Sequence, residues 1–125
     1  MARAAIPSSS NLKISVDQEG KDAVVRLTGR IDVDSSPDLR DRLRTLLSAK
    51  ALPQTIIVDL AGVSYLETSA VATLIEALRI ARHRQINFRL QGLSGPTLRL
   101  FEVTGVFALF QANDSGQSGS GQKVP

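Results

Sequence analysis

The feature that most constrains the fold of this chain is an uninterrupted β-branched run near its middle, Thr55-Ile56-Ile57-Val58. Such a run is typical of a strand that is covered on both faces. Amphipathic helical patterns lie on either side of it. Their apolar positions are Leu39, Leu43, Leu46 and Leu47 before the run, and Val71, Leu74, Ile75 and Leu78 after it. Strands that alternate with helices in this way predict an α/β domain with parallel neighbouring strands.

The remaining segments extend this pattern on both sides. Two β-rich segments, Leu12–Val16 and Ala23–Leu27, are separated by a short turn, and they are expected to pair as an antiparallel hairpin. Ser36 is the expected N-cap of the first helix, with Pro37 at its first position. The second helix is expected to begin near Thr68.

Three more elements are expected towards the C-terminus. They are a strand over roughly 87–93, a helix that starts at Ser94-Gly95-Pro96 and ends at Gly105, and a last short strand over Val106–Phe110. The predicted order is ββαβαβαβ, a mixed sheet with helices packed on it. At 125 residues the chain has room for one core. We expect a domain over 11–112, a flexible N-terminus over 1–10 and a disordered Gly/Ser-rich tail over 113–125.

Composition excludes several classes of function. The chain has no cysteine and one histidine, His83, so a thiolate or histidine metal site and a conventional catalytic triad are not expected. No glycine-rich phosphate loop is present, and we expect neither a cofactor nor enzymatic activity. The net charge is +3, but four Phe and one Tyr supply a poor stacking platform, so nucleic acid is not an expected partner. No apolar run is long enough for a bilayer, and a cytoplasmic protein is expected.

The residues most suggestive of function follow the buried central strand. Binding sites in α/β sheets tend to lie beyond the carboxyl ends of parallel strands. Glu67, Thr68 and Ser69 occupy that place, at the expected start of the second helix. The free N–H groups and the dipole of a helix N-terminus would stabilise a phosphate there. From position alone, Thr68 fits both a phosphorylated hydroxyl and an ordinary N-cap.

Three separated stretches resemble the STAS family (sulphate transporter and anti-sigma factor antagonist). They are Arg26-Leu-Thr-Gly-Arg-Ile-Asp, Ile57-Val-Asp-Leu-Ala-Gly-Val-Ser-Tyr-Leu-Glu-Thr-Ser-Ala and Pro96-Thr-Leu-Arg-Leu-Phe-Glu-Val-Thr-Gly-Val-Phe. The resemblance, strongest to the anti-sigma factor antagonist branch, implies phosphorylation of Thr68, with Ser69 as a secondary acceptor. It implies a partner surface made by Asp32, Glu67, Thr68, Ser69 and Ala70. Glu67 and Ala70 stand where the family pattern has aspartate and glycine.

The resemblance also implies a function. The unphosphorylated chain would bind an anti-sigma factor that is a serine/threonine kinase and so release a sigma factor, and a phosphatase would reverse the modification. A different role stays open, in which the same surface belongs to a non-enzymatic scaffold, either a subunit of a lipid-trafficking ABC transporter or a member of a stress-signalling complex. Whether the chain forms a weak dimer also stays open.

Overall fold

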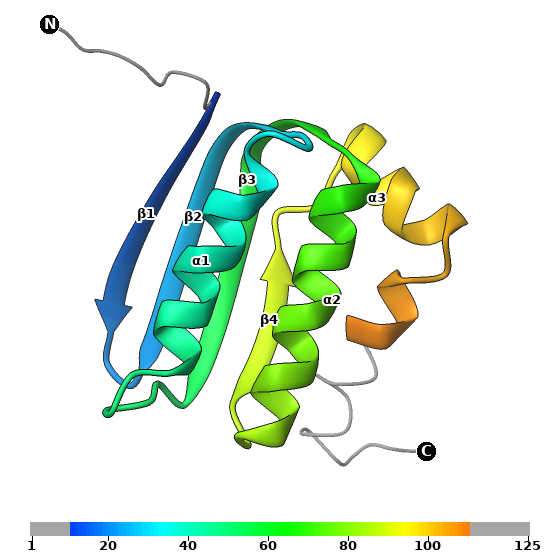
Figure 1. Cartoon of the computed structure of the whole chain (residues 1–125). Helices are drawn as coiled ribbons and strands as arrows, with labels where there is room; N and C mark the ends of the chain where they lie inside the picture. The colour runs from blue at the N-terminus through cyan, green and yellow to red at the C-terminus, as the bar shows by residue number, and fades with distance from the viewer. Residues whose placement is uncertain (1–10, 111–125) are drawn as a thin grey trace, which may run out of the picture.

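A four-stranded mixed sheet organises the molecule (Figure 1). The computed structural model describes residues 11–110, so the expected flexible ends at 1–10 and 113–125 lie outside the described residues. The strands follow one another across the sheet in the order of the sequence. They are β1 (Leu12–Glu19), β2 (Asp22–Ile31), β3 (Thr55–Leu66) and β4 (Asn87–Gln91). The β1–β2 pair is antiparallel, while β3 runs parallel to both β2 and β4, which confirms the predicted hairpin and the parallel neighbours.

The β-branched run lies where the sequence places it, in an inner strand. Ile56 and Val58 are fully buried, and the sheet surrounds them with β2 on one side and β4 on the other. Strand β3 continues well past the β-branched run and ends at Leu66. That extension carries the chain to the edge of the sheet where the candidate site begins.

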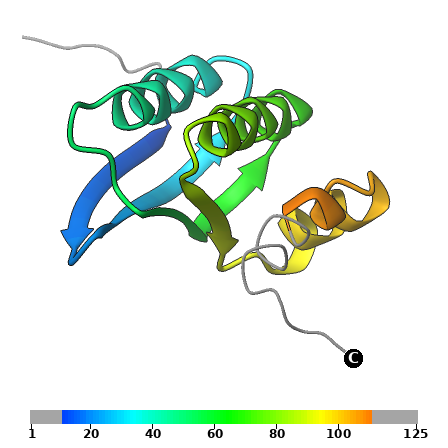
Figure 2. The same ribbon diagram turned by 90° about the horizontal axis from the view of Figure 1, so that it is seen from below.

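Two helices, α1 (Ser36–Leu47) and α2 (Thr68–His83), lie side by side on one face of the sheet (Figure 2). They bury the predicted stripes: Leu39, Leu43 and Leu47 in α1, and Val71, Leu74 and Leu78 in α2. The predicted start of α1 is wrong by one residue, because Ser35 is the N-cap and Ser36 already belongs to the helix. The hydroxyl of Ser36 is thereby free for a contact described below.

The C-terminal part differs from the prediction. The helix α3 (Gly95–Val103) is present, but the predicted strand over Val106–Phe110 is wrong, since residues 107–110 form a helical turn. Gly105 adopts a left-handed conformation with φ 75°, which turns the chain back. Phe110 then packs against Phe88 and Phe101, with ring centroids 6.2 and 6.0 Å apart. This apolar segment is therefore buried through the packing of the Phe110 ring and not through pairing with a strand of the sheet.

Gly29 lies in the stretch Arg26–Asp32, and its surroundings explain why this position is a glycine. Its φ is +109°, and a Cβ at this position would lie 2.0 Å from the carbonyl oxygen of Asn11. That oxygen cannot move away cheaply, because it accepts a hydrogen bond from the N–H of Arg30 at 3.1 Å. The start of β1 and the end of β2 therefore approach each other more closely than any side chain would permit.

We predict that Gly29→Ala lowers the free energy of unfolding by about 2–5 kcal/mol, the sum of a left-handed backbone penalty and a steric one. Gly20→Ala is the matched control, because Gly20 also has positive φ but has open space around it; we expect a loss of about 1–2 kcal/mol there. Urea unfolding of both variants measures the difference. Equal losses would show that the contact with Asn11 imposes no constraint.

Candidate functional site

Two loops meet beyond the carboxyl ends of β2 and β3. One loop joins β2 to α1 and contains residues 32–35, and the other is the junction between β3 and α2 at Glu67. The N–H of Glu67 donates to the carbonyl of Ile31 at 2.9 Å, which continues the contact between the two strands past their last paired residues. This arrangement brings Asp32, Glu67, Thr68 and Ser69 to one edge of the sheet, as the sequence predicts.

The carboxylate of Glu67 ties these loops together. One oxygen, Oε1, accepts the backbone N–H of Val33 at 3.1 Å, and the other, Oε2, accepts the hydroxyl of Tyr65 at 3.1 Å. Glu67 is the N-cap of α2, yet its side chain makes no capping hydrogen bond. A glutamate is one methylene longer than the aspartate of the family pattern, and it uses this length to reach the neighbouring loop. The departure at Glu67 therefore has a structural role.

A second link runs between the first turns of α1 and α2. Ser36 Oγ lies 2.7 Å from the carbonyl of Asp32 and 3.0 Å from Ser69 Oγ. Because a hydroxyl has one proton and the carbonyl can only accept, Ser36 donates to Asp32, and Ser69 donates to Ser36. The half-buried hydroxyl of Ser69 is thus engaged in holding the two helix starts together.

Thr68 differs from all of its polar neighbours. It is the first residue of α2 and it is exposed, and its hydroxyl makes no hydrogen bond to any residue within 11–110. The interpretation of Thr68 as an N-cap is wrong, since Glu67 occupies that position. The first N–H groups of a helix have no acceptor within the helix, and the helix dipole adds positive potential near them. The surroundings of Thr68 can therefore accommodate an added phosphate.

Asp32 stabilises its own loop and also lies on the surface around Thr68. Its Oδ1 accepts the N–H groups of Asp34 and Ser35, both at 3.0 Å, and the hydroxyl of Ser35 lies 3.1 Å from the same oxygen. The backbone hydrogen bond from Ser35 is the main reason that the pKa of Asp32 lies below its usual value. Asp32 is therefore ionised at neutral pH and fixed in position, a half-buried negative charge close to Glu67.

Tyr65 contributes to this surface. Its side chain is 38% exposed, and the guanidinium of Arg30 lies over its ring, 4.1 Å from the centroid. The hydrogen bond that it donates to Glu67 raises the pKa of Tyr65 above the usual value. The stacked guanidinium of Arg30 and the hydrogen bond to Glu67 together hold the Tyr65 ring in place. The tyrosine hydroxyl in turn orients the Glu67 carboxylate.

Ala70 does not belong to the partner surface. It is completely buried, because α2 turns this position towards the sheet. The expectation that Ala70 contacts a partner is therefore wrong. His83, by contrast, is exposed at the other end of α2. Within residues 11–110 no cluster of His, Asp or Glu side chains could hold a metal ion, and no helix there is long and apolar enough to cross a membrane.

Comparisons with known proteins show the family to which this fold belongs. The family model described as "Mlab, STAS domain" matches residues 14–111, which is most of the chain. The chain belongs to the STAS family. A curated relative of this STAS domain is the anti-sigma-B factor antagonist of Bacillus subtilis, 27% identical over 109 residues, with 87% of this chain and 97% of the relative covered.

Solved structures share the fold. An anti-sigma factor antagonist from Mycobacterium paratuberculosis superposes with a TM-score of 0.69 at 19% identity, covering 83% of this chain and 86% of that one. The Bacillus antagonist SpoIIAA is similar in its unphosphorylated form, with a TM-score of 0.67 at 20% identity and coverage of 75% and 82%. Its phosphorylated form gives 0.63 at 20% identity, with coverage of 77% and 86%.

The Glu67 contact can be measured directly, because Tyr65 is the one tyrosine of the chain. The folded state holds the Tyr65 proton to a higher pH than the unfolded state does. The stability gained from this contact is therefore present below pH 10 or so and is lost as the pH rises through the raised pKa. We predict that Glu67→Gln lowers the pKa of Tyr65 towards its usual value, as read from the ultraviolet absorbance of the tyrosinate.

Glu102→Gln is the matched control, because Glu102 is exposed on α3. This substitution removes the same charge at a position that makes no contact with Tyr65. Circular dichroism at each pH ensures that the titrated chain is folded. Identical Tyr65 titrations in the two variants would show that Glu67 does not hold the tyrosine hydroxyl.

Proposed function

We propose that this STAS domain is an anti-sigma factor antagonist that is switched by phosphorylation of Thr68. The observation that carries the proposal is the exposed hydroxyl of Thr68, which has no hydrogen bond within 11–110 while Glu67 and Ser69 on either side of it are engaged. Relatives named anti-sigma-B factor antagonist, matched over nearly their full length, support the same function.

The switch follows from charge. A phosphate on Thr68 adds about −1.5 to −2 charges at neutral pH. It would join the carboxylates of Asp32 and Glu67, which the loops hold in fixed positions. A partner surface that fits the unmodified hydroxyl would meet like-charge repulsion and a larger, more strongly solvated group. Each loss of about 1.4 kcal/mol weakens binding tenfold, so a modest mismatch is enough for a switch.

The partner that fits this role is a serine/threonine kinase anti-sigma factor. It would bind the unmodified chain, release its sigma factor, and transfer the γ-phosphoryl group of ATP to Thr68 Oγ1, with the threonine proton taken by the kinase. A phosphatase would then hydrolyse the phosphate ester and restore binding. The domain itself has no catalytic role in this cycle: His83 lies at the far end of α2, roughly 22 Å of helix away from Thr68.

Phosphorylation gives the direct test. We predict that a kinase-type anti-sigma factor encoded in the same genome, with ATP, adds one phosphoryl group to the wild-type chain and none to Thr68→Ala. Ser69→Ala is the control, because it removes the neighbouring hydroxyl, and it should still be modified. Intact-mass and peptide mass spectrometry locate the phosphate.

Two results would contradict the assignment. Modification of Thr68→Ala to the wild-type extent would place the phosphate elsewhere. Modification that disappears in Ser69→Ala but persists in Thr68→Ala would make Ser69 the acceptor, against its half-buried and hydrogen-bonded position.

A further inference from the structure

A groove lies beside the candidate site, between the first halves of α1 and α2. Its volume is about 350 Å³, and its lining includes Val33, Pro37, Arg40, Ser69, Ala72 and Glu76. Ser69 connects it to the site, because the same side chain forms the link to Ser36. Val33 is an apolar residue, 64% exposed, that lines the groove from within the loop that Glu67 holds. The groove and the surface around Thr68 are thus continuous.

Arg40 is the unusual residue of this groove. Its Nε atom is buried and has no hydrogen-bond partner among the described residues. Arg44, one turn later on α1, forms an ion pair with Glu76, so the carboxylate in the groove is already engaged. A buried donor without a partner is costly, and such groups in native structures usually have a specific reason. The half-buried guanidinium as a whole forms no ion pair among the described residues either, and an acidic side chain is the partner with which a guanidinium forms its strongest paired hydrogen bonds.

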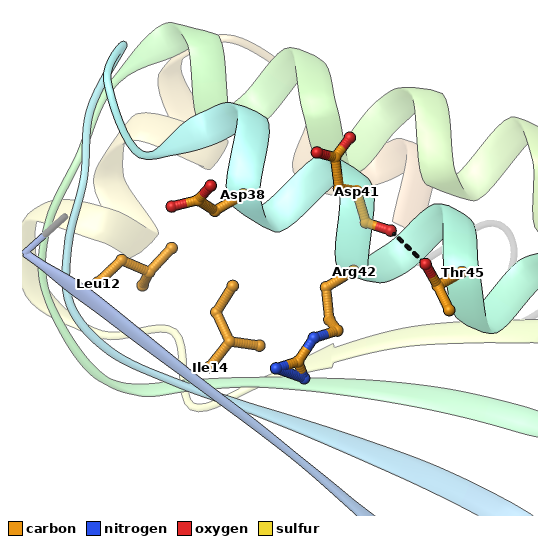
Figure 3. Close-up of a pocket in the computed structure, with 6 residues that line it drawn as sticks. All are labelled: Leu12, Ile14, Asp38, Asp41, Arg42 and Thr45. Carbon is orange, nitrogen blue, oxygen red and sulfur yellow. Dashed lines mark hydrogen bonds between the residues drawn. The ribbon is translucent and has the colours of Figure 1, made fainter. Parts of the chain in front are cut away.

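The other flank of α1 shows that this situation is local. A hollow of about 380 Å³ lies between α1 and β1. Leu12 and Ile14 line it from β1, and Asp38, Asp41, Arg42 and Thr45 line it from α1 (Figure 3). Two aspartates of α1 also line this hollow, and Arg42 is exposed, so none of its nitrogen atoms is buried without a partner. The groove that contains Arg40 has no carboxylate to spare, and it also adjoins Thr68.

We propose that the groove between α1 and α2 is a docking site for an acidic side chain of the anti-sigma factor, whose carboxylate pairs with the guanidinium of Arg40. The proposal rests on the proposed function and extends it to a residue outside the two loops. Val33, Pro37 and Ala72 supply apolar surface that excludes water around the ion pair, and Arg40 supplies a positive charge that no described carboxylate pairs with. Such a pair selects among partners by charge, because a partner with a neutral or basic residue at this place would leave Arg40 unpaired.

The test compares the two flanks of α1 by titrating the anti-sigma factor into purified variants. We expect Arg40→Ala to raise the Kd at least about tenfold, and Arg40→Glu to raise it further through repulsion. Arg42→Ala and Arg42→Glu are matched controls, because they make the same charge changes on the same helix but face β1. These should bind within about twofold of wild type. Circular dichroism checks that each variant is folded, and the absence of a hydrogen bond from Arg40 Nε predicts that none is lost on replacement.

A second measurement needs no variant. Amide hydrogen exchange of the wild-type chain should slow, on binding of the anti-sigma factor, in the halves of α1 and α2 that line the groove, and stay unchanged in β1. Arg40 variants that bind like wild type, or protection confined to β1, would overturn the docking site. Arg40 variants that change self-association but leave the anti-sigma factor affinity intact would overturn it as well.

The outcomes separate this inference from the proposed function. If the wild-type chain does not bind the anti-sigma factor at all, the proposed function fails, and the docking site with it. If the wild-type chain binds and is phosphorylated on Thr68, but Arg40 and Arg42 variants behave alike, the function stands and the docking site alone is wrong.

Discussion

The carboxylate of Glu67 is the contact on which the rest of the site depends. Its two oxygens accept hydrogen bonds from different segments, Val33 on the loop before α1 and Tyr65 at the end of β3. This side chain therefore joins the loop after β2 to the end of β3, in addition to the backbone bond from Glu67 to Ile31 and the link between Ser36 and Ser69. Hydrogen bonds to a charged acceptor are stronger than neutral ones, so this bridge is well suited to hold two exposed loops in one arrangement.

The neighbours of Thr68 make the contacts that hold the site together, so on the proposed function a phosphate on Thr68 breaks none of these contacts. Ser69 is bonded to Ser36, and Asp32 closes its own turn, so both helix starts are fixed before any phosphate is added. Thr68 lies between these contacts and takes part in none that the described residues show. Phosphorylation on this account changes the charge and shape of a fixed surface, while the fold stays as it is.

The sequence predicted those features that rest on local patterns. The run Thr55–Val58 identified an inner strand, and the short turn near Gly20 identified the hairpin, because periodicity and turn chemistry are visible in neighbouring residues. The sequence showed the motif that contains Gly29 but not the reason for this glycine, because the clash that a side chain would make is with Asn11, eighteen positions earlier in the chain. The place of Thr68 at a helix start was likewise predicted.

Features that depend on tertiary contacts were missed. The segment Val106–Phe110 is apolar enough for a strand, and its helical turn follows from the contacts of Phe110 with two distant rings. Neither the burial of Ala70 nor the exposure of Tyr65 could be read from residue type. The unpaired Nε of Arg40 could not be predicted at all, because one alternation of basic and acidic residues along α1 fits both a solvated arginine and an unsatisfied one.

The most direct test of this account is the affinity of the anti-sigma factor for the chain before and after phosphorylation of Thr68, measured with a folded sample of each. The account predicts that phosphorylation weakens binding by about a hundredfold or more, equivalent to about 2.8 kcal/mol. The backbone amide NMR signals of the sheet should stay unchanged. Equal affinities for the two forms would contradict the account. So would a loss of binding that is accompanied by unfolding, because the switch would then act through the fold instead of through the surface.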